Sequence, residues 1–190
     1  MKGFTDDASE LSGVIGRFHE TRAGILAAAA ASMAARLAAG GKVLVFGNGG
    51  SAAEAQHFAA ELVNGLRRRD RRPLPAIALA TDASILTAIG NDRGFDRVFS
   101  RQIEALGRPG DVALALTASG ASANVIDALK TARAAGLVTI VLTGEKGEAA
   151  APLADVLLDV PSCSTPRIQE AHLFILHYLA RYMEDAAGRP

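Results

Sequence analysis

Five short apolar runs, separated by longer helix-forming stretches, constrain the fold of this chain more than any other feature. The runs cover residues 43–46, 76–79, 112–116, 138–142 and 156–160. Continuous apolar strands that alternate with helices are typical of a parallel sheet that is covered on both faces. The sequence therefore predicts an α/β fold, a three-layer αβα sandwich around a five-stranded parallel sheet.

The stretches around these strands predict six helices. They cover residues 9–39, 52–63, 83–89, 98–106, 122–135 and 166–186. The first forms a helical N-terminal arm that stops at Gly40 and Gly41, and the last carries more apolar surface than one solvated face needs. Both helices either cover the sheet of their own chain or pack against another subunit. The spacing of their apolar residues favours neither arrangement. We expect one domain over residues 1–190, with the arm at 1–40 and the α/β core at 41–190.

Charge and cysteine content narrow the class of partner. Twenty Lys and Arg residues balance twenty Asp and Glu residues, so no net field attracts nucleic acid or an anionic membrane. The basic run at 67–72 falls in a predicted loop without interleaved aromatic residues, which indicates a solvated loop. The single Cys163 excludes an internal disulfide, and the N-terminus does not resemble a signal peptide. We expect a cytoplasmic protein that binds a small molecule.

Two loops that follow predicted strands have the composition of anion sites. The first, GNGGS at 47–51, leads a strand into a helix through glycines, which allow a ligand to approach helix N–H groups closely. The second, TASGAS at 117–122, offers three hydroxyls and no lysine, which favours a phosphate monoester over a nucleoside triphosphate. A tight turn without ligand, a capping role for Ser122 and a dinucleotide site remain alternatives. Against the last, the nearest acid, Asp82, lies beyond the usual distance.

Polar side chains on two helices could transfer protons or bind a metal. His57 and Glu61 lie four residues apart and project from one helical face, although such pairs are more often surface contacts. A second group, at 169–172 and His177, interrupts an apolar helix. Spacing alone favours Glu170 with His177, because seven residues make nearly two turns. His172 could equally be a core or interface residue.

Four segments give a more specific combination than either loop alone. They are FGNGGSAAEAQHFAAE at 46–61, GND at 90–92, FSRQ at 99–102 and TPRIQEAH at 165–172. From about residue 41 to the last helix, the chain resembles the bacterial phosphoheptose isomerases, which are single sugar-isomerase (SIS) domains. The resemblance implies conversion of sedoheptulose 7-phosphate to D-glycero-D-manno-heptose 7-phosphate through an enediolate, for the heptose of bacterial surface polysaccharides. It also implies one zinc ion per subunit and a homotetramer with active sites between subunits.

The resemblance also assigns roles to individual positions. The implied zinc ligands are His57, Glu61, Gln169 and His177, of which Glu61 would be the base and His177 the acid. The implied substrate contacts are Asn48, Gly49, Gly50, Ser51, Asn91, Asp92, Thr117, Ala118, Ser119, Ser122 and Gln169. The chain departs from the family at Ala118 and Ala121, where the family usually has Thr and Asn or Lys. Ala118 removes one side-chain donor, although its backbone N–H remains.

Two other classes of protein share these features. SIS domains also occur in sugar-phosphate sensors and in proteins that associate with the bacterial replication initiator, neither of which needs proton-transfer groups. The presence of all four implied metal ligands argues against these binding proteins. A nicotinamide-dependent oxidoreductase is the second alternative, on the strength of the glycine loop alone.

Overall fold

The sheet of the computed structural model, which describes residues 3–68 and 70–188, is five-stranded and entirely parallel. Its strands are β1 (Val43–Gly47), β2 (Ala76–Ala78), β3 (Val112–Thr117), β4 (Val138–Thr143) and β5 (Val156–Asp159), in the order β2-β1-β3-β4-β5. The predicted sheet is thus confirmed. β1, β3 and β4 each continue one residue beyond their apolar run, because Gly47, Thr117 and Thr143 still pair with the neighbouring strand.

Within the described residues, six α-helices and two 3-10 turns accompany the strands; α1 precedes β1, α6 follows β5, and the others lie between strands. The helices are α1 (Phe4–Ala38), α2 (Gly50–Asn64), α3 (Ala83–Arg93), α4 (Ser100–Leu106), α5 (Ala123–Ala134) and α6 (Thr165–Ala187). The 3-10 turns are η1 (Phe95–Arg97) and η2 (Ala151–Leu153). The ends of most helices differ by a few residues from those predicted. The largest differences are at α1, which begins at Phe4 and not at residue 9, and at α3, which continues from residue 89 to Arg93. α4 starts later than residue 98 because η1 and Val98 lead into it.

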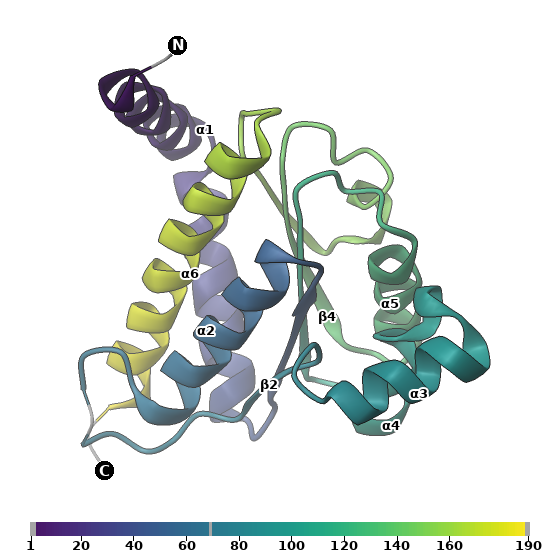
Figure 1. The fold of residues 1–190 in the computed structure, drawn as a ribbon. Helices are drawn as coiled ribbons and strands as arrows, with labels where there is room; N and C mark the ends of the chain where they lie inside the picture. Colours follow the sequence, from purple (N-terminus) through teal and green to yellow (C-terminus); the bar gives the residue numbers. More distant parts are fainter. Residues whose placement is uncertain (1–2, 69, 189–190) are drawn as a thin grey trace.

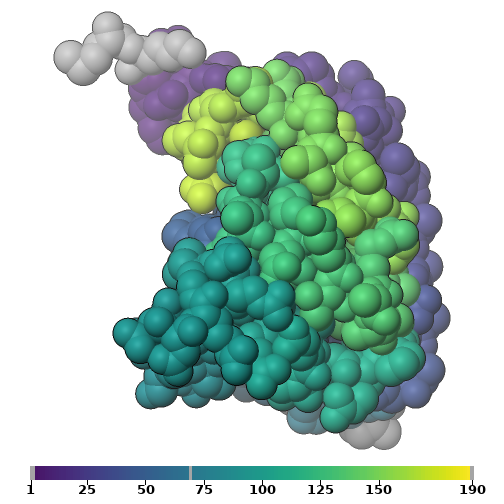
Figure 2. Space-filling model, turned by 90° about the vertical axis from the view of Figure 1, so that its right-hand side faces the viewer, coloured from purple at the N-terminus to yellow at the C-terminus, as the bar shows by residue number. Residues whose placement is uncertain are grey.

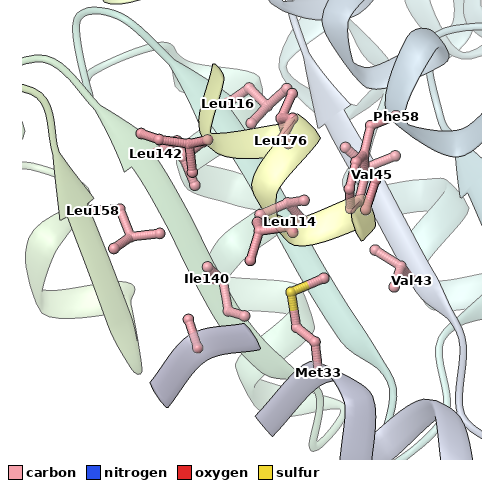
Figure 3. Close-up of a cluster of buried hydrophobic side chains, with 14 of the residues drawn as sticks. Met33, Val43, Val45, Phe58, Leu114, Leu116, Ile140, Leu142, Leu158 and Leu176 are labelled. Carbon is pink, nitrogen blue, oxygen red and sulfur yellow. The ribbon is translucent and has the colours of Figure 1, made fainter. Parts of the chain in front are cut away.

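Alternation along the central strands divides the apolar core into two halves. Val43 and Val45 of β1 and Leu114 of β3 face α1, α2 and α6, and Figure 3 shows them with Met33 and Leu176 in this half. Leu44 and Phe46, which alternate with the two valines along β1, face α4 and α5 on the other side of the sheet. Burial on both faces explains why the strands are continuously apolar, and it produces the three layers visible in Figure 1.

The two terminal helices cover the sheet of their own chain. α1 and α6 pack against each other on the face that α2 also covers, and α6 buries Ile175, Leu176 and Leu179 there. Phe174 points away from this layer and is 57% exposed. In the view of Figure 2, α3, α4 and α5 form most of the surface, with α1 along its border. No helix in the described part of the chain is long and apolar enough to cross a membrane.

The predicted basic loop is attached to the body of the protein by two buried charges. Glu184 of α6 is fully buried and accepts hydrogen bonds from the backbone N–H groups of Leu66, Arg67 and Arg68, at 2.6, 3.1 and 3.2 Å. Arg71 is also buried, and its guanidinium Nε lies 3.5 Å from Glu184 Oε1. Arg71 is therefore part of a structural clamp, and the prediction of a solvated loop was wrong for this residue; Arg69 of the run lies outside the described residues.

Candidate active site

A cavity of about 340 Å³ opens at the carboxyl ends of β1 and β3, where both predicted anion loops meet. Ligands of open α/β sheets bind at such edges. The lining residues are Asn48, Ser51, Leu116, Thr117, Ala118, Ser119, Ser122, Lys146, Ser162, Cys163, Thr165, Ile168 and Gln169. The structure thus brings together most of the predicted substrate contacts, from two loops and the start of α6.

The glycine loop needs its glycines because other groups approach it closely. A Cβ added to Gly47 would lie 2.6 Å from the carbonyl oxygen of Leu116, and one added to Gly50 would collide with the side-chain amide of Gln169. Gly49 has a φ of +55° and precedes α2 without a side-chain cap. The N–H groups of Ser51 and Ala52 at the start of α2 already donate to the carbonyl oxygens of Asn48 and Gly49, at 3.0 and 3.1 Å, so this end of the helix offers an anion mainly its dipole.

The hydroxyl loop holds two of its side chains internally and leaves a third without such a bond. Thr117 Oγ1 accepts the N–H of Gly120 at 3.1 Å, and Ser119 Oγ accepts that of Ala121 at 3.3 Å. Ser122 precedes α5, but its side chain makes no capping hydrogen bond. The capping alternative for Ser122 therefore does not describe this structure, and its hydroxyl lines the cavity instead.

A pair of side-chain amides connects the two loops. Asn48 Nδ2 donates to Asn124 Oδ1 at 2.9 Å, and Asn124 Nδ2 donates to Asn48 Oδ1 at 2.8 Å. Asn124 is buried at the start of α5. Because each amide satisfies the other, Asn48 is held in one orientation at the edge of the cavity.

Three of the four predicted metal ligands converge between α2 and α6. His57 Nε2 lies 3.0 Å from Glu61 Oε1 and 3.1 Å from His177 Nε2, and His177 Nε2 lies 3.2 Å from the same carboxylate oxygen. Glu61 is only 7% exposed, whereas the side chains of His57 and His177 are 50% and 42% exposed. The three donor atoms therefore meet at a site that solvent and a ligand can reach.

The chemistry of these donors fits a cation. A neutral imidazole has one donor and one acceptor nitrogen, so two Nε2 atoms and a carboxylate oxygen at about 3 Å bring lone pairs together. The second oxygen of Glu61 is buried and has no hydrogen-bond partner. Two histidines and a carboxylate are a common ligand set for zinc. His57, Glu61 and His177 could therefore hold a metal ion. The side chain of Gln169, the fourth predicted ligand, lies near Gly50 and lines the cavity.

Other predicted residues lie apart from this cluster. Asn91 and Asp92 lie on the exposed end of α3, where Asn91 Nδ2 donates to Asp92 Oδ1 at 2.8 Å, and neither lines the cavity. Glu170 accepts a hydrogen bond from Arg167 at 2.6 Å, so the pairing with His177 that spacing favoured is not observed. His172 is buried, and burial lowers its pKa to about 4, so it is a neutral core residue.

Several residues near the site escaped the sequence analysis. Lys146, from the loop after β4, and Thr165 line the cavity, and Asn124 is hydrogen-bonded to Asn48, which lines it. β4 neighbours β3 and ends at the same edge of the sheet, so the loop after β4 could have been predicted to reach the cavity. Glu54 lies on α2 between the glycine loop and His57, with one oxygen buried and unpartnered. Burial raises the pKa of Glu54 to about 7.

Comparison with known proteins gives a consistent result. A family model described as "SIS domain" matches residues 8–144. The phosphoheptose isomerases of Rhodospirillum rubrum and Aquifex aeolicus are 53% and 56% identical, over 85% and 80% of both chains in each case. A solved phosphoheptose isomerase from Neisseria gonorrhoeae superposes with a TM-score of 0.89 at 43% identity, covering 95% of this chain and 96% of the other.

More distant structures share only the fold. The sugar isomerase domain of an RpiR transcription factor from Sphaerobacter thermophilus aligns with a TM-score of 0.61 at 20% identity, covering 97% of this chain and 90% of that one. A likeness at this level of identity carries no information on activity.

Proposed function

The chain belongs to the phosphoheptose isomerase family of SIS-domain proteins, and we propose that it converts sedoheptulose 7-phosphate to D-glycero-D-manno-heptose 7-phosphate with the residues described above. The activity itself, an aldose–ketose isomerisation that serves heptose biosynthesis, follows from the family. The observation that carries the assignment of residues is the convergence of His57, Glu61 and His177 beside the cavity helices α2 and α6. A sensor without catalysis would not need this cluster.

The placement of the two sites suits a long substrate. Ser51 lines the cavity and His57 follows six residues later on α2, which is about 9 Å along the helix axis. An extended open-chain heptose phosphate spans a distance of this order. With its phosphate near the hydroxyls of Ser119 and Ser122 and the positive end of the α2 dipole, its carbonyl end would reach the cluster.

The reaction moves one proton between neighbouring carbons. We infer that the carboxylate of Glu61 removes the proton from C1 of the ketose, which leaves a 1,2-enediolate, and that a proton returns to C2 to give the aldose. His177 transfers the accompanying proton between the two oxygens, so that charge on neither oxygen persists.

A metal ion, when bound, would polarise the carbonyl oxygen as a Lewis acid. His57, Glu61 and His177 are the residues that would hold it, and the family likeness favours zinc with Gln169 as a fourth ligand. Gln169 also lines the cavity, so its amide could bind a substrate hydroxyl instead. Metal analysis of the purified protein and of the His57→Ala variant separates zinc from other ions.

We further infer a homotetramer with active sites at subunit boundaries. Two observations support this inference: Phe174 is exposed beside His177, and both lie in a shallow groove with Leu66, Tyr178 and Arg181. A large exposed aromatic side chain beside a catalytic group is typical of a surface that another protein covers. Light scattering coupled to size-exclusion chromatography measures the mass directly, and a monomer at micromolar concentration would contradict the inference.

The activity is tested with sedoheptulose 7-phosphate and metal-analysed protein, following the aldose by NMR. His57→Ala and His177→Ala should each lower kcat at least ~100-fold, as expected for loss of a group that handles protons or holds the metal. His19→Ala, an exposed histidine on α1, is the matched control and should leave the rate unchanged. No product from the wild-type protein would exclude this substrate, and equal loss in all three variants would exclude the assigned site.

A further inference from the structure

The cavity that would receive the phosphate has an unusual charge pattern. Of its lining side chains, Lys146 is the one with a formal charge at neutral pH, and the others are hydroxyls, amides, a thiol and apolar groups. The loop that supplies the hydroxyls contains no lysine, and Ala118 and Ala121 in it carry no polar side chain. A phosphate monoester carries nearly two negative charges at pH 7. The hydroxyl loop alone therefore leaves that charge uncompensated.

The backbone around Lys146 is held against the hydroxyl loop. Gly144 N–H donates to the carbonyl oxygen of Ala118 at 3.1 Å, which ties the loop after β4 to the loop after β3. Glu145 N–H donates to the carbonyl oxygen of Ser162 at 3.2 Å. The two loops also touch directly, because a Cβ on Gly120 would lie 2.7 Å from the Cα of Gly147 and 3.1 Å from the carbonyl oxygen of Lys146. The position of Lys146 at the cavity is thus fixed by its neighbours.

The ammonium group of Lys146 has no ion-pair partner within the described ranges, although two acids share its loop. One of them, Glu145, accepts a hydrogen bond from the thiol of Cys163 at 2.9 Å. The other, Glu148, does not line the cavity. A lysine on a four-carbon stem acts as a mobile point charge, which suits an anion that enters and leaves.

We propose that Lys146 forms an ion pair with the phosphate of the substrate and supplies the positive charge that the hydroxyl loop lacks. This role rests on the proposed function, because it assumes a phosphorylated ligand in the cavity. Lys146 is a specificity-determining residue here: it distinguishes a phosphorylated sugar from a neutral one and takes no part in proton transfer. Its contribution is the same in the ground state and the transition state, so it affects KM and not kcat.

The test compares Lys146→Gln and Lys146→Arg with Lys130→Gln, an exposed lysine of α5 outside the cavity. Lys146→Gln should raise KM for sedoheptulose 7-phosphate about ten-fold and leave kcat within about two-fold, since a charge-assisted hydrogen bond is lost. Lys146→Arg should recover most of the affinity. Added NaCl should raise KM of the wild type more steeply than that of Lys146→Gln. An unchanged KM in Lys146→Gln, or an equal rise in Lys130→Gln, would overturn the proposal.

Binding of inorganic phosphate, measured by calorimetry, separates this proposal from the proposed function. If the wild type binds phosphate and Lys146→Gln binds it about ten-fold more weakly, the lysine has its role even in a protein that does not turn over the heptose. If both proteins bind phosphate equally well, or neither binds it, Lys146 is not the phosphate residue. Turnover by the wild type together with equal phosphate binding would retain the isomerase and reject the lysine.

Discussion

The clamp between Arg71 and Glu184 gives the most quantitative prediction about the framework of the site. Arg71 Nη2 donates to the carbonyl oxygens of Glu61 and Leu62, at 2.7 Å in each case, and its Nη1 donates to that of Arg72 at 2.8 Å. The first two are terminal carbonyls of α2, so the guanidinium caps the helix that carries Glu61, the carboxylate proposed as the base. Leucine at position 71 would remove the charge and leave both carbonyls and Glu184 without this partner.

The expected cost follows from these contacts. Removing one partner of a buried charge pair destabilises a protein by about 3–5 kcal/mol, because the other charge stays buried. Three backbone N–H groups still bind Glu184 in Arg71→Leu, so we expect the lower end, about 3 kcal/mol. kcat should fall as well, since the last turn of α2 positions Glu61. Activity should fall at temperatures where the protein is still folded.

Urea unfolding followed by circular dichroism measures this cost at one fixed protein concentration. Arg72→Leu is the matched control, because this neighbouring arginine is exposed and should change the free energy of unfolding by less than about 0.5 kcal/mol. A loss below about 1 kcal/mol in Arg71→Leu, or equal losses in both variants, would refute the assignment of Arg71 and Glu184 as a buried clamp.

Three further predictions concern individual buried groups. His172 is neutral in the folded protein because burial lowers its pKa to about 4, so stability should fall as pH drops from about 6.5 towards 4, and His172→Leu should flatten that part of a urea-unfolding pH series. Burial raises the pKa of Glu54 to about 7, so the folded protein favours the protonated carboxyl and stability is lost as pH rises from about 4.5 to 7. At pH 8, Glu54→Gln should therefore unfold at a higher temperature than the wild type, with a free energy of unfolding that is larger by roughly 1 kcal/mol for this half-exposed group. At pH 5 the two proteins should unfold alike. Asn124→Leu leaves Asn48 without its amide partner, so it should raise KM several-fold and lower the free energy of unfolding by about 1–3 kcal/mol. Steady-state kinetics and urea unfolding measure the two effects. No change in either would show that water replaces the amide pair.

The sheet could be predicted because its strands obey a strong local rule. A strand that is buried on both faces needs apolar side chains throughout. The sequence is apolar without interruption from Val43 to Phe46 and from Val112 to Leu116. The edge strand β2 is weaker: it has three residues, and its Ile77 is partly exposed. Strand ends were less accurate, because Thr117 and Thr143 pair in the sheet through the backbone, which side-chain polarity does not reveal.

The site could be predicted in part, for a related reason. The i,i+4 spacing of His57 and Glu61 and the glycine loop are local patterns, and the structure agrees with both. The contact with His177 depends on how α2 and α6 pack, which spacing within one helix does not determine. Lys146 likewise reaches the cavity, and Asn124 reaches Asn48, only through tertiary structure. Their positions follow from the order of β1, β3 and β4 in the sheet.

The central claim is that Glu61 removes the proton during isomerisation, and one experiment in heavy water tests it most directly. Wild-type protein turning over sedoheptulose 7-phosphate in D₂O should place deuterium at C2 of the aldose, observable by NMR, because the proton on Glu61 can exchange with solvent through the half-exposed His57 and His177 beside it. Glu61→Gln should bind phosphate as the wild type does and show neither product nor exchange at C1 of the substrate. Retained turnover or retained exchange in Glu61→Gln would contradict the account.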